Sequence, residues 1–274
     1  MSASDGMYGI VGEMIDKETQ YFPINYSIFL ETGLDIEFRF NKLIHSLKNG
    51  DTLLLPLNYA FYSTKENKQY FSYYQNMLSW GNPNFFYSYP LLSLKTLLKS
   101  PPSKIPSGLL YYLQNIKVKE KLIDSTIQRW AKNPQTFHGD SVQSLDQYGE
   151  FRHHQGTLLK QNIKEQYLSQ DSRVETYFLS HYKKLEDFCN QHNIKILFTY
   201  PPMLENTNFN LNNSQDLKKI KNLQNQLHQY GIKLLGNPKD FQFPIQDFYD
   251  TPNHLNTQGA IKYTKELIKI LNQS

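Results

Sequence analysis

The chain has 274 residues, of which 39% are apolar and 14% aromatic, which is enough to build a core and excludes a disordered protein. Its net charge of +4 comes from 29 basic and 25 acidic residues that are mixed along the chain, so no nucleic-acid partner is indicated. The one cysteine, Cys189, excludes internal disulfides and metal sites built from several cysteines, and it is predicted to pack in the core. Because no run of 18 apolar residues and no signal peptide is visible, the chain as written is predicted to be soluble and, by default, cytoplasmic.

The first third of the chain alternates between helical and strand-like patterns. Residues 6–16 predict a short helix, and residues 21–29 predict a buried strand. Residues 33–50 have the apolar spacing of an amphipathic helix closed by an Asn-Gly pair. Residues 51–59, "DTLLLPLNY", form a continuous apolar run of strand length.

The last third alternates in the same way. Helices are predicted over residues 174–192, 214–230 and 257–272, and strands over residues 194–202 and 231–236. Strands that are apolar throughout and alternate with helices indicate a parallel sheet covered by helices on both faces. The middle, residues 60–171, is rich in Tyr, Phe, Ser and Pro and breaks this rhythm. It is predicted to be an insertion of helices and loops, either a cap over the site or a surface for packing or a partner.

Four candidate residues follow predicted strands, at the sheet edge where ligands bind in parallel α/β folds. They are Gly33, Asn58, Asp250 and His254, and Ser4 precedes a predicted helix at the start of the chain. A serine hydroxyl becomes a nucleophile when a base takes its proton. His254 is the candidate base, and Asp250 is the candidate acid that orients it. The backbone N–H groups of Ser4 and Gly33 and the Asn58 amide are candidate donors to an oxyanion.

These residues lie in segments that resemble the SGNH (GDSL-like) hydrolases, most closely a bacterial branch often associated with surface-polysaccharide modification. "SASDGMYGI" resembles the nucleophile block and assigns Ser4. "NYSIFLETGLDIEFRFNKLIHSLKNGDTLLLPLNYAFY" resembles the second and third blocks and assigns Gly33 and Asn58. "FTYPPM" resembles the fourth-strand segment, and "FYDTPNHLNTQG" resembles the block that carries Asp250 and His254. The resemblance covers about residues 2–60 and 194–272.

The resemblance implies one SGNH-like α/β domain over residues 1–274, a flavodoxin-like α/β/α sandwich with a parallel sheet of about five strands and the inserted 60–171 segment. It implies a serine esterase or O-acyltransferase that acts on small acyl esters, with acetyl groups on a carbohydrate as the expected substrate and with no metal or organic cofactor needed. The alternative is a catalytically inactive member that binds a glycan or a partner in polysaccharide assembly.

In this family the nucleophile follows the first strand, whereas only Met1, Ser2 and Ala3 precede Ser4 here. The expectation is that an upstream strand is missing, in this branch often with a membrane anchor, which would place the native protein outside the cytoplasmic membrane. Membrane association is expected only through such an anchor. The opposing interpretation is that Met1 is the true start and the sheet is rebuilt or the protein is inactive.

Two other motifs are weaker candidates. Gly139-Asp140-Ser141 spells the family's name motif, but no strand pattern precedes it, so Ser141 is the less favoured nucleophile. His153 and His154 are adjacent and point in different directions, which makes a poor metal chelate and favours a solvated loop.

Overall fold

The structure is a computed structural model, and it describes residues 4–27, 40, 43–63, 145–151, 155–160 and 162–274. The chain divides into two compact units, one made of Met1–Lys65 with Gln135–Ser274 and the other of Glu66–Pro134. Every described residue belongs to the first unit. Most of the predicted insertion over 60–171 therefore lies outside the described residues, and its role as a cap stays a prediction.

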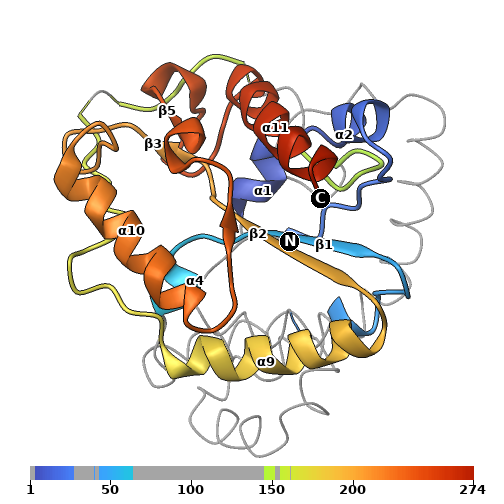
Figure 1. Cartoon of the computed structure of the whole chain (residues 1–274). Coiled ribbons are helices and arrows are strands. Elements are labelled where there is room, and N and C mark those ends of the chain that lie inside the picture. Colours follow the sequence, from blue (N-terminus) through green and yellow to red (C-terminus); the bar gives the residue numbers. More distant parts are fainter. Residues whose placement is uncertain (1–3, 28–39, 41–42, 64–144, 152–154, 161) are drawn as a thin grey trace, which may run out of the picture. The chain divides into compact units, whose positions relative to one another are not determined.

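A three-stranded parallel sheet forms the centre of the described unit (Figure 1). Its strands are β1 (Thr52–Pro56), β2 (Lys195–Thr199) and β4 (Leu234–Leu235), in the order β1-β2-β4. Both neighbouring pairs are parallel, and Leu54 lies opposite Leu197 in the register. The sequence prediction of an α/β fold with parallel strands is confirmed.

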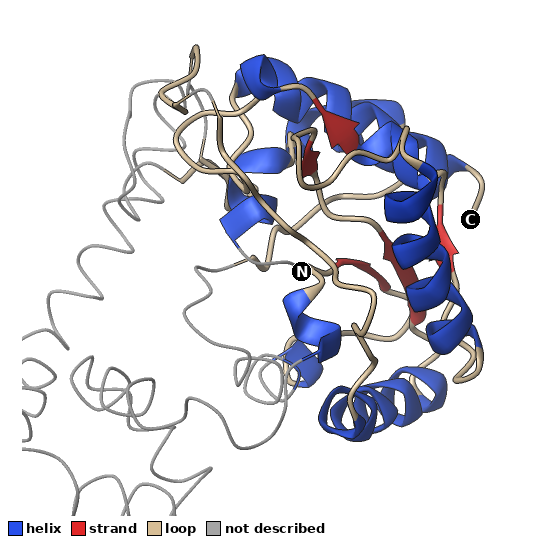
Figure 2. Cartoon of the chain, turned by 90° about the vertical axis from the view of Figure 1, so that its left-hand side faces the viewer, coloured by secondary structure: helices blue, strands red, loops and turns tan. Residues whose placement is uncertain are grey.

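Helices cover both faces of this sheet, which explains why its strands are apolar throughout. On one face lies α9 (Thr176–Gln191), where the Tyr182 ring meets the Phe198 ring of β2 edge-on at 5.3 Å. On the other face lie α2 (Gly12–Glu18) and α11 (Thr257–Asn272). The buried side chains that join these two helices to the sheet are Ile15, Leu197, Ile268 and Leu271. The view in Figure 2 shows helices above and below the strands.

Two further short strands form a separate parallel pair, β3 (Met203–Leu204) with β5 (Gln242–Phe243). The sequence predicts one sheet of about five strands, whereas the described strands form one sheet of three and one of two. Pro201 and Pro202 follow β2 and have no N–H to donate, so ladder pairing stops there. The next strand, β3, pairs with β5 and not with a strand of the central sheet.

The N-terminal segment forms two short helices, α1 (Ser4–Gly9) and α2, where the sequence predicts one over residues 6–16. The strand predicted over residues 21–29 is wrong for its described part: residues 21–27 have no regular structure. Phe22 and Ile24 there are 67% and 78% exposed, so their apolar character does not mark a core strand.

Asn25 holds this irregular segment in place. Its backbone N–H donates to the Tyr148 carbonyl at 2.8 Å, and its Nδ2 donates to the Gly6 carbonyl at 2.8 Å. Residues 21–27 therefore link α1 to the loop around Tyr148 through hydrogen bonds, and they do not join the sheet. Of the helix predicted over residues 33–50, the described part is helical at residues 40, 43 and 44 and becomes a turn from residue 45.

The three long helices of the last third are confirmed. The sequence predicts them over 174–192, 214–230 and 257–272, and the structure has α9, α10 (Ser214–His228) and α11 at those places. Asparagines begin two of them, because the Asn213 and Asn256 side chains accept hydrogen bonds from the first backbone N–H groups of α10 and α11.

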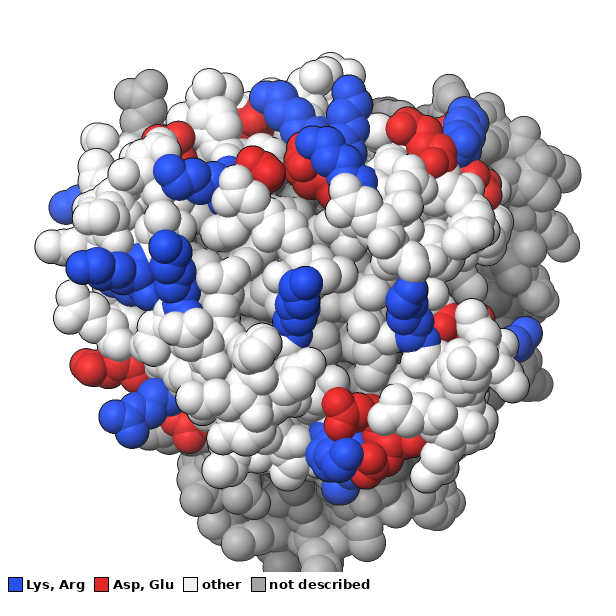
Figure 3. All heavy atoms as spheres, in the orientation of Figure 1, with Lys and Arg blue, Asp and Glu red and all other residues white. Residues whose placement is uncertain are grey.

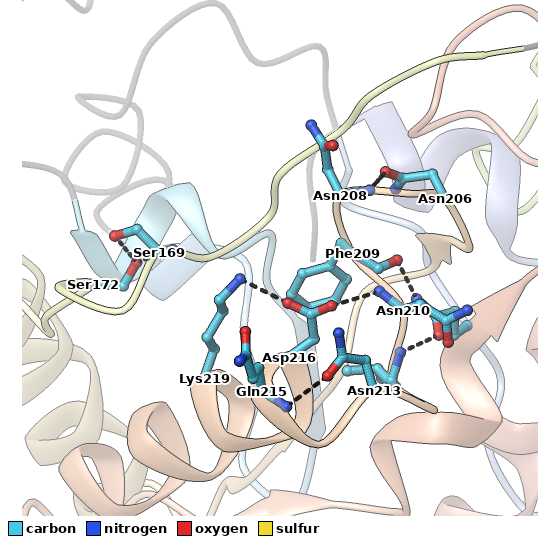
Figure 4. Close-up of polar contacts among 12 residues, drawn as sticks. Ser169, Ser172, Asn206, Asn208, Phe209, Asn210, Asn213, Gln215, Asp216 and Lys219 are labelled. Carbon is cyan, nitrogen blue, oxygen red and sulfur yellow. Dashed lines mark hydrogen bonds and ion pairs between the residues drawn. The ribbon is translucent and has the colours of Figure 1, made fainter.

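The Asn-rich loop before α10 uses its side chains to fold on itself (Figure 4). Asn206 Oδ1 accepts from the Asn208 N–H at 2.9 Å, and Asp216 Oδ2 accepts from the Asn210 N–H at 3.0 Å. Asp216 also pairs with Lys219 at 2.7 Å. These contacts are typical of Asx turns and helix capping, so they explain the composition of this loop as a structural feature.

On the face shown in Figure 3, Lys and Arg side chains are interspersed with Asp and Glu side chains. Among the described residues, no helix has both the length and the apolar character needed to cross a membrane.

Candidate active site

The loop that precedes α11 brings Asp250 and His254 together. Its ends are joined by an antiparallel bridge between Phe248 and Leu255, and the Tyr249 N–H donates to the His254 carbonyl at 2.8 Å. Inside this closed loop, His254 Nδ1 lies 2.8 Å from Asp250 Oδ1. This hydrogen bond holds the imidazole as the tautomer with its proton on Nδ1, so proton exchange with a substrate falls to Nε2.

Tyr8 holds the same imidazole on one face. The rings of Tyr8 and His254 stack with their centroids 3.9 Å apart and their planes at 7°. Tyr8 belongs to α1 and is buried. Ser4 begins the same helix four residues earlier, and residues at that spacing lie on one face of a helix. The Tyr8 stack thus packs α1, the helix that begins with Ser4, against His254.

A cavity of about 360 Å³ borders the loop that carries Asp250 and His254, although neither of these two side chains is part of its described lining. Nine described residues line it, namely Ser4, Asp5, Asn58, Ala60, Ser63, Glu165, Gln166, Tyr167 and Asn253. Two of them, Ser4 and Asn58, are predicted site residues, and Asn253 directly precedes His254. A cavity of this size suits a small ligand or one sugar-sized group.

Asn58 is oriented by the short helix that follows β1. Its Oδ1 accepts from the Ala60 N–H at 3.1 Å, and its carbonyl accepts from the Phe61 N–H at 3.0 Å at the start of α4 (Ala60–Ser63). Because the side-chain oxygen is used in this way, the Nδ2 group is the half of the amide that can donate to a ligand. Asn58 is thus suited to the predicted role of oxyanion donor.

Asn256 is a buried support that the sequence analysis did not single out. Its Oδ1 accepts from the Gln258 and Gly259 N–H groups at 3.1 and 3.0 Å, which caps α11. Its Nδ2 donates to the carbonyls of Gly156 and Gln246 at 3.0 and 2.7 Å. One side chain thus fixes both ends of the loop that carries Asp250 and His254. An asparagine directly before the predicted helix start was the available signal.

Tyr167 supports the same loop from the cavity wall. Its hydroxyl accepts from the Leu204 N–H at 2.7 Å and donates to the Pro252 carbonyl at 3.0 Å. Burial raises the pKa of Tyr167 well above its usual value, and the charges of Glu165 and Asp5 raise it further. The hydroxyl therefore stays protonated and links β3 to the Asp250–His254 loop. No sequence motif surrounds Tyr167, and Tyr8, although it lies in the segment "SASDGMYGI", was not singled out as a site residue.

The remaining residues that the sequence analysis considered are not part of the described cavity lining. Gly33, Ser141, His153 and His154 lie outside the described residues. Cys189 is fully buried, and burial raises the pKa of its thiol to about 11, in keeping with the predicted packing role. Within the part of the chain that the structure describes, no group of three or more His, Cys, Asp or Glu side chains gathers in a way that could hold a metal ion.

No protein-family model, no curated protein and no solved structure matches the chain.

Proposed function

We propose that the chain is a serine esterase or O-acyltransferase of the SGNH type, with Ser4 as nucleophile, His254 as base and Asp250 as the orienting acid. The observation that carries the proposal is the placement of His254. Its Nδ1 is hydrogen-bonded to Asp250, and its ring is stacked on Tyr8, one helical turn from Ser4. This orientation suits His254 to act as a base, and the neighbouring Asn253 lines the same cavity as Ser4. Among the described residues, the structure records no hydrogen bond between Ser4 Oγ and His254, so the proposal requires that this contact forms when substrate binds.

In the acylation step, His254 Nε2 takes the Ser4 hydroxyl proton as Oγ bonds to the acyl carbonyl carbon. The carbonyl oxygen becomes an oxyanion, which the Ser4 N–H, the Gly33 N–H and Asn58 Nδ2 would bind. The ester C–O bond then breaks, and the imidazolium returns its proton to the departing alkoxide. Asp250 stabilises the imidazolium while it exists and does not itself take the proton.

In the deacylation step, water or a sugar hydroxyl gives a proton to His254 Nε2 and attacks the acyl-Ser4 carbonyl. Collapse of the second tetrahedral intermediate returns this proton to Ser4 Oγ and releases a free acid or a new ester. A hydrolase and a transferase therefore share every residue of this scheme and differ only in the acceptor.

The cavity lining supports a hydroxyl-rich substrate such as an O-acetylated carbohydrate. Hydroxyl, amide and carboxyl side chains form most of the lining, and such groups exchange hydrogen bonds with sugar hydroxyls. The finer fold, an SGNH sandwich with about five strands, belongs to the same proposal. Parallel strands with helices on both faces support it.

The first test is hydrolysis of p-nitrophenyl acetate by the wild-type chain and by Asp250→Asn. The wild type is expected to turn the ester over well above the rate in buffer. Asp250→Asn is expected to lower kcat by about 10⁴-fold, the loss known for the triad carboxylate of a serine protease, because the wrong imidazole tautomer faces the serine.

Asp187→Asn is the matched control, because Asp187 pairs with Lys183 on α9, on the opposite face of the sheet from α11. It is expected to keep wild-type turnover. A folded wild-type protein with no turnover would contradict the proposal and favour the alternative, a protein that binds a glycan or an assembly partner without catalysis.

A further inference from the structure

Two carboxylates, those of Asp5 and Glu165, line the cavity that Ser4, Asn58 and Asn253 also line. Asp5 is buried, with 1% of its surface exposed, and Glu165 is half-buried. The other described lining residues are alanine, serine, asparagine, glutamine and tyrosine, so none of the described lining carries a positive charge. The charged side chains of the described lining are therefore all acidic, which disfavours a negatively charged ligand.

Both carboxylates influence the same residue of the cavity wall, Tyr167. Both Glu165 and Asp5 raise the pKa of Tyr167, whose hydroxyl lies in that wall. Burial raises the pKa of Glu165 itself, and no hydrogen bond or ion pair links its carboxylate to any other described residue. Glu165 is therefore partly desolvated without a compensating cation, an arrangement that costs free energy unless a ligand supplies the partner.

From these observations we infer that Glu165 is a specificity-determining residue, which makes the cavity select acyl esters of neutral or cationic alcohols and reject esters of anionic ones. This inference rests on the proposed function, and it specifies which charge the ester substrate carries. The carboxylate accepts hydrogen bonds from the hydroxyl groups of a neutral sugar or pairs with the ammonium group of an amino sugar. An acidic sugar brings a second negative charge into the same partly desolvated space, where like charges repel.

The test uses three aryl acetates that differ in the charge of one substituent: 4-acetoxybenzamide, 4-acetoxybenzoate and (4-acetoxybenzyl)trimethylammonium. Each is assayed at pH 8 with the wild type and with Glu165→Gln, which keeps the shape and removes the charge. The ratio of kcat/KM for the anionic ester to that for the neutral ester is expected to rise about fivefold to tenfold in Glu165→Gln. The ratio for the cationic ester is expected to fall by a similar factor, and both changes are expected mainly in KM.

Glu266→Gln is the matched control, because Glu266 lies on α11 beside Lys269 and outside the cavity lining. Both ratios are expected to stay at their wild-type values in this variant. Equal ratios in the wild type and Glu165→Gln would overturn the charge selection while leaving the esterase proposal intact.

Equilibrium binding keeps the two proposals separate. The same three esters are titrated into Ser4→Ala protein with and without Glu165→Gln, so that no turnover is needed. The cationic ester is expected to bind more tightly than the anionic one, and this difference is expected to shrink by about fivefold to tenfold in Glu165→Gln, where Asp5 remains. If the wild type hydrolyses none of the esters but Ser4→Ala binds them in this order, only the catalytic proposal is contradicted. If Ser4→Ala binds the three esters equally well, the charge selection is contradicted.

Discussion

Replacing Ser4 by alanine is expected to lower kcat for p-nitrophenyl acetate by about a millionfold, the loss known when a serine protease loses its nucleophile. Alanine has no hydroxyl to form the acyl-enzyme, and the stacked, hydrogen-bonded His254 then has no proton to accept from residue 4. Ser4 lines the cavity at the first position of α1, so its substitution removes one oxygen atom without opening a void in the core. The folded state is therefore expected to survive, as checked by circular dichroism.

Two serine controls define the result. Ser180→Ala removes a hydroxyl that donates to the Tyr177 carbonyl on α9, and it is expected to keep full activity. Ser141→Ala tests the competing Gly-Asp-Ser motif and is also expected to keep activity. Loss of turnover in Ser141→Ala together with normal turnover in Ser4→Ala would move the nucleophile to that motif.

Replacing Asn256 by alanine is expected to give the largest loss of stability, about 2–3 kcal/mol in the free energy of unfolding. The side chain is buried, and it caps α11 while it donates to the carbonyls of Gly156 and Gln246. Alanine leaves these backbone groups without their partner, and water can reach the carbonyls of Gly156 and Gln246, which belong to exposed residues, more easily than the buried Gly259 N–H. Urea unfolding followed by circular dichroism measures the loss.

Asn213→Ala is the matched control, since Asn213 caps α10 by accepting from the Gln215 N–H at 2.9 Å in an exposed position. Its expected cost is about 1 kcal/mol, the usual value of a helix N-cap. The difference between the two variants measures what the two Nδ2 donations of Asn256 contribute. Equal losses would mean that Asn256 acts only as a cap and does not hold the loop of Asp250 and His254.

The parts of the fold that follow from local pattern were predictable from sequence. The apolar stripe of residues 257–272 and the asparagine before it define α11, and the run "TLLLP" is apolar enough to mark β1. The strand predicted over residues 21–29 failed in its described part, because the side chain of Asn25 ties that segment to α1 and to the Tyr148 loop. Hydrogen bonds between segments that are distant in sequence leave no periodic pattern from which they could be predicted.

The residues of the candidate site also differ in how far they could be predicted from sequence. Asp250 and His254 are close in sequence, so their pairing could be anticipated from one short segment. The contact between Tyr8 and His254 joins opposite ends of the chain, and it depends on how α1 packs against α11 and the loop before it. Glu165 and Tyr167 lie in a segment without regular structure, where neither helical nor strand periodicity shows which side chains face a cavity.

The most direct test of the Ser4–His254–Asp250 site is covalent labelling with a fluorophosphonate, followed by peptide mass spectrometry. An activated serine attacks the phosphorus and displaces fluoride, which leaves a stable phosphonyl ester on its Oγ. The account predicts one adduct, on the peptide that carries Ser4, which is lost in His254→Ala. No adduct on folded protein, or an adduct on Ser141 instead, would contradict it.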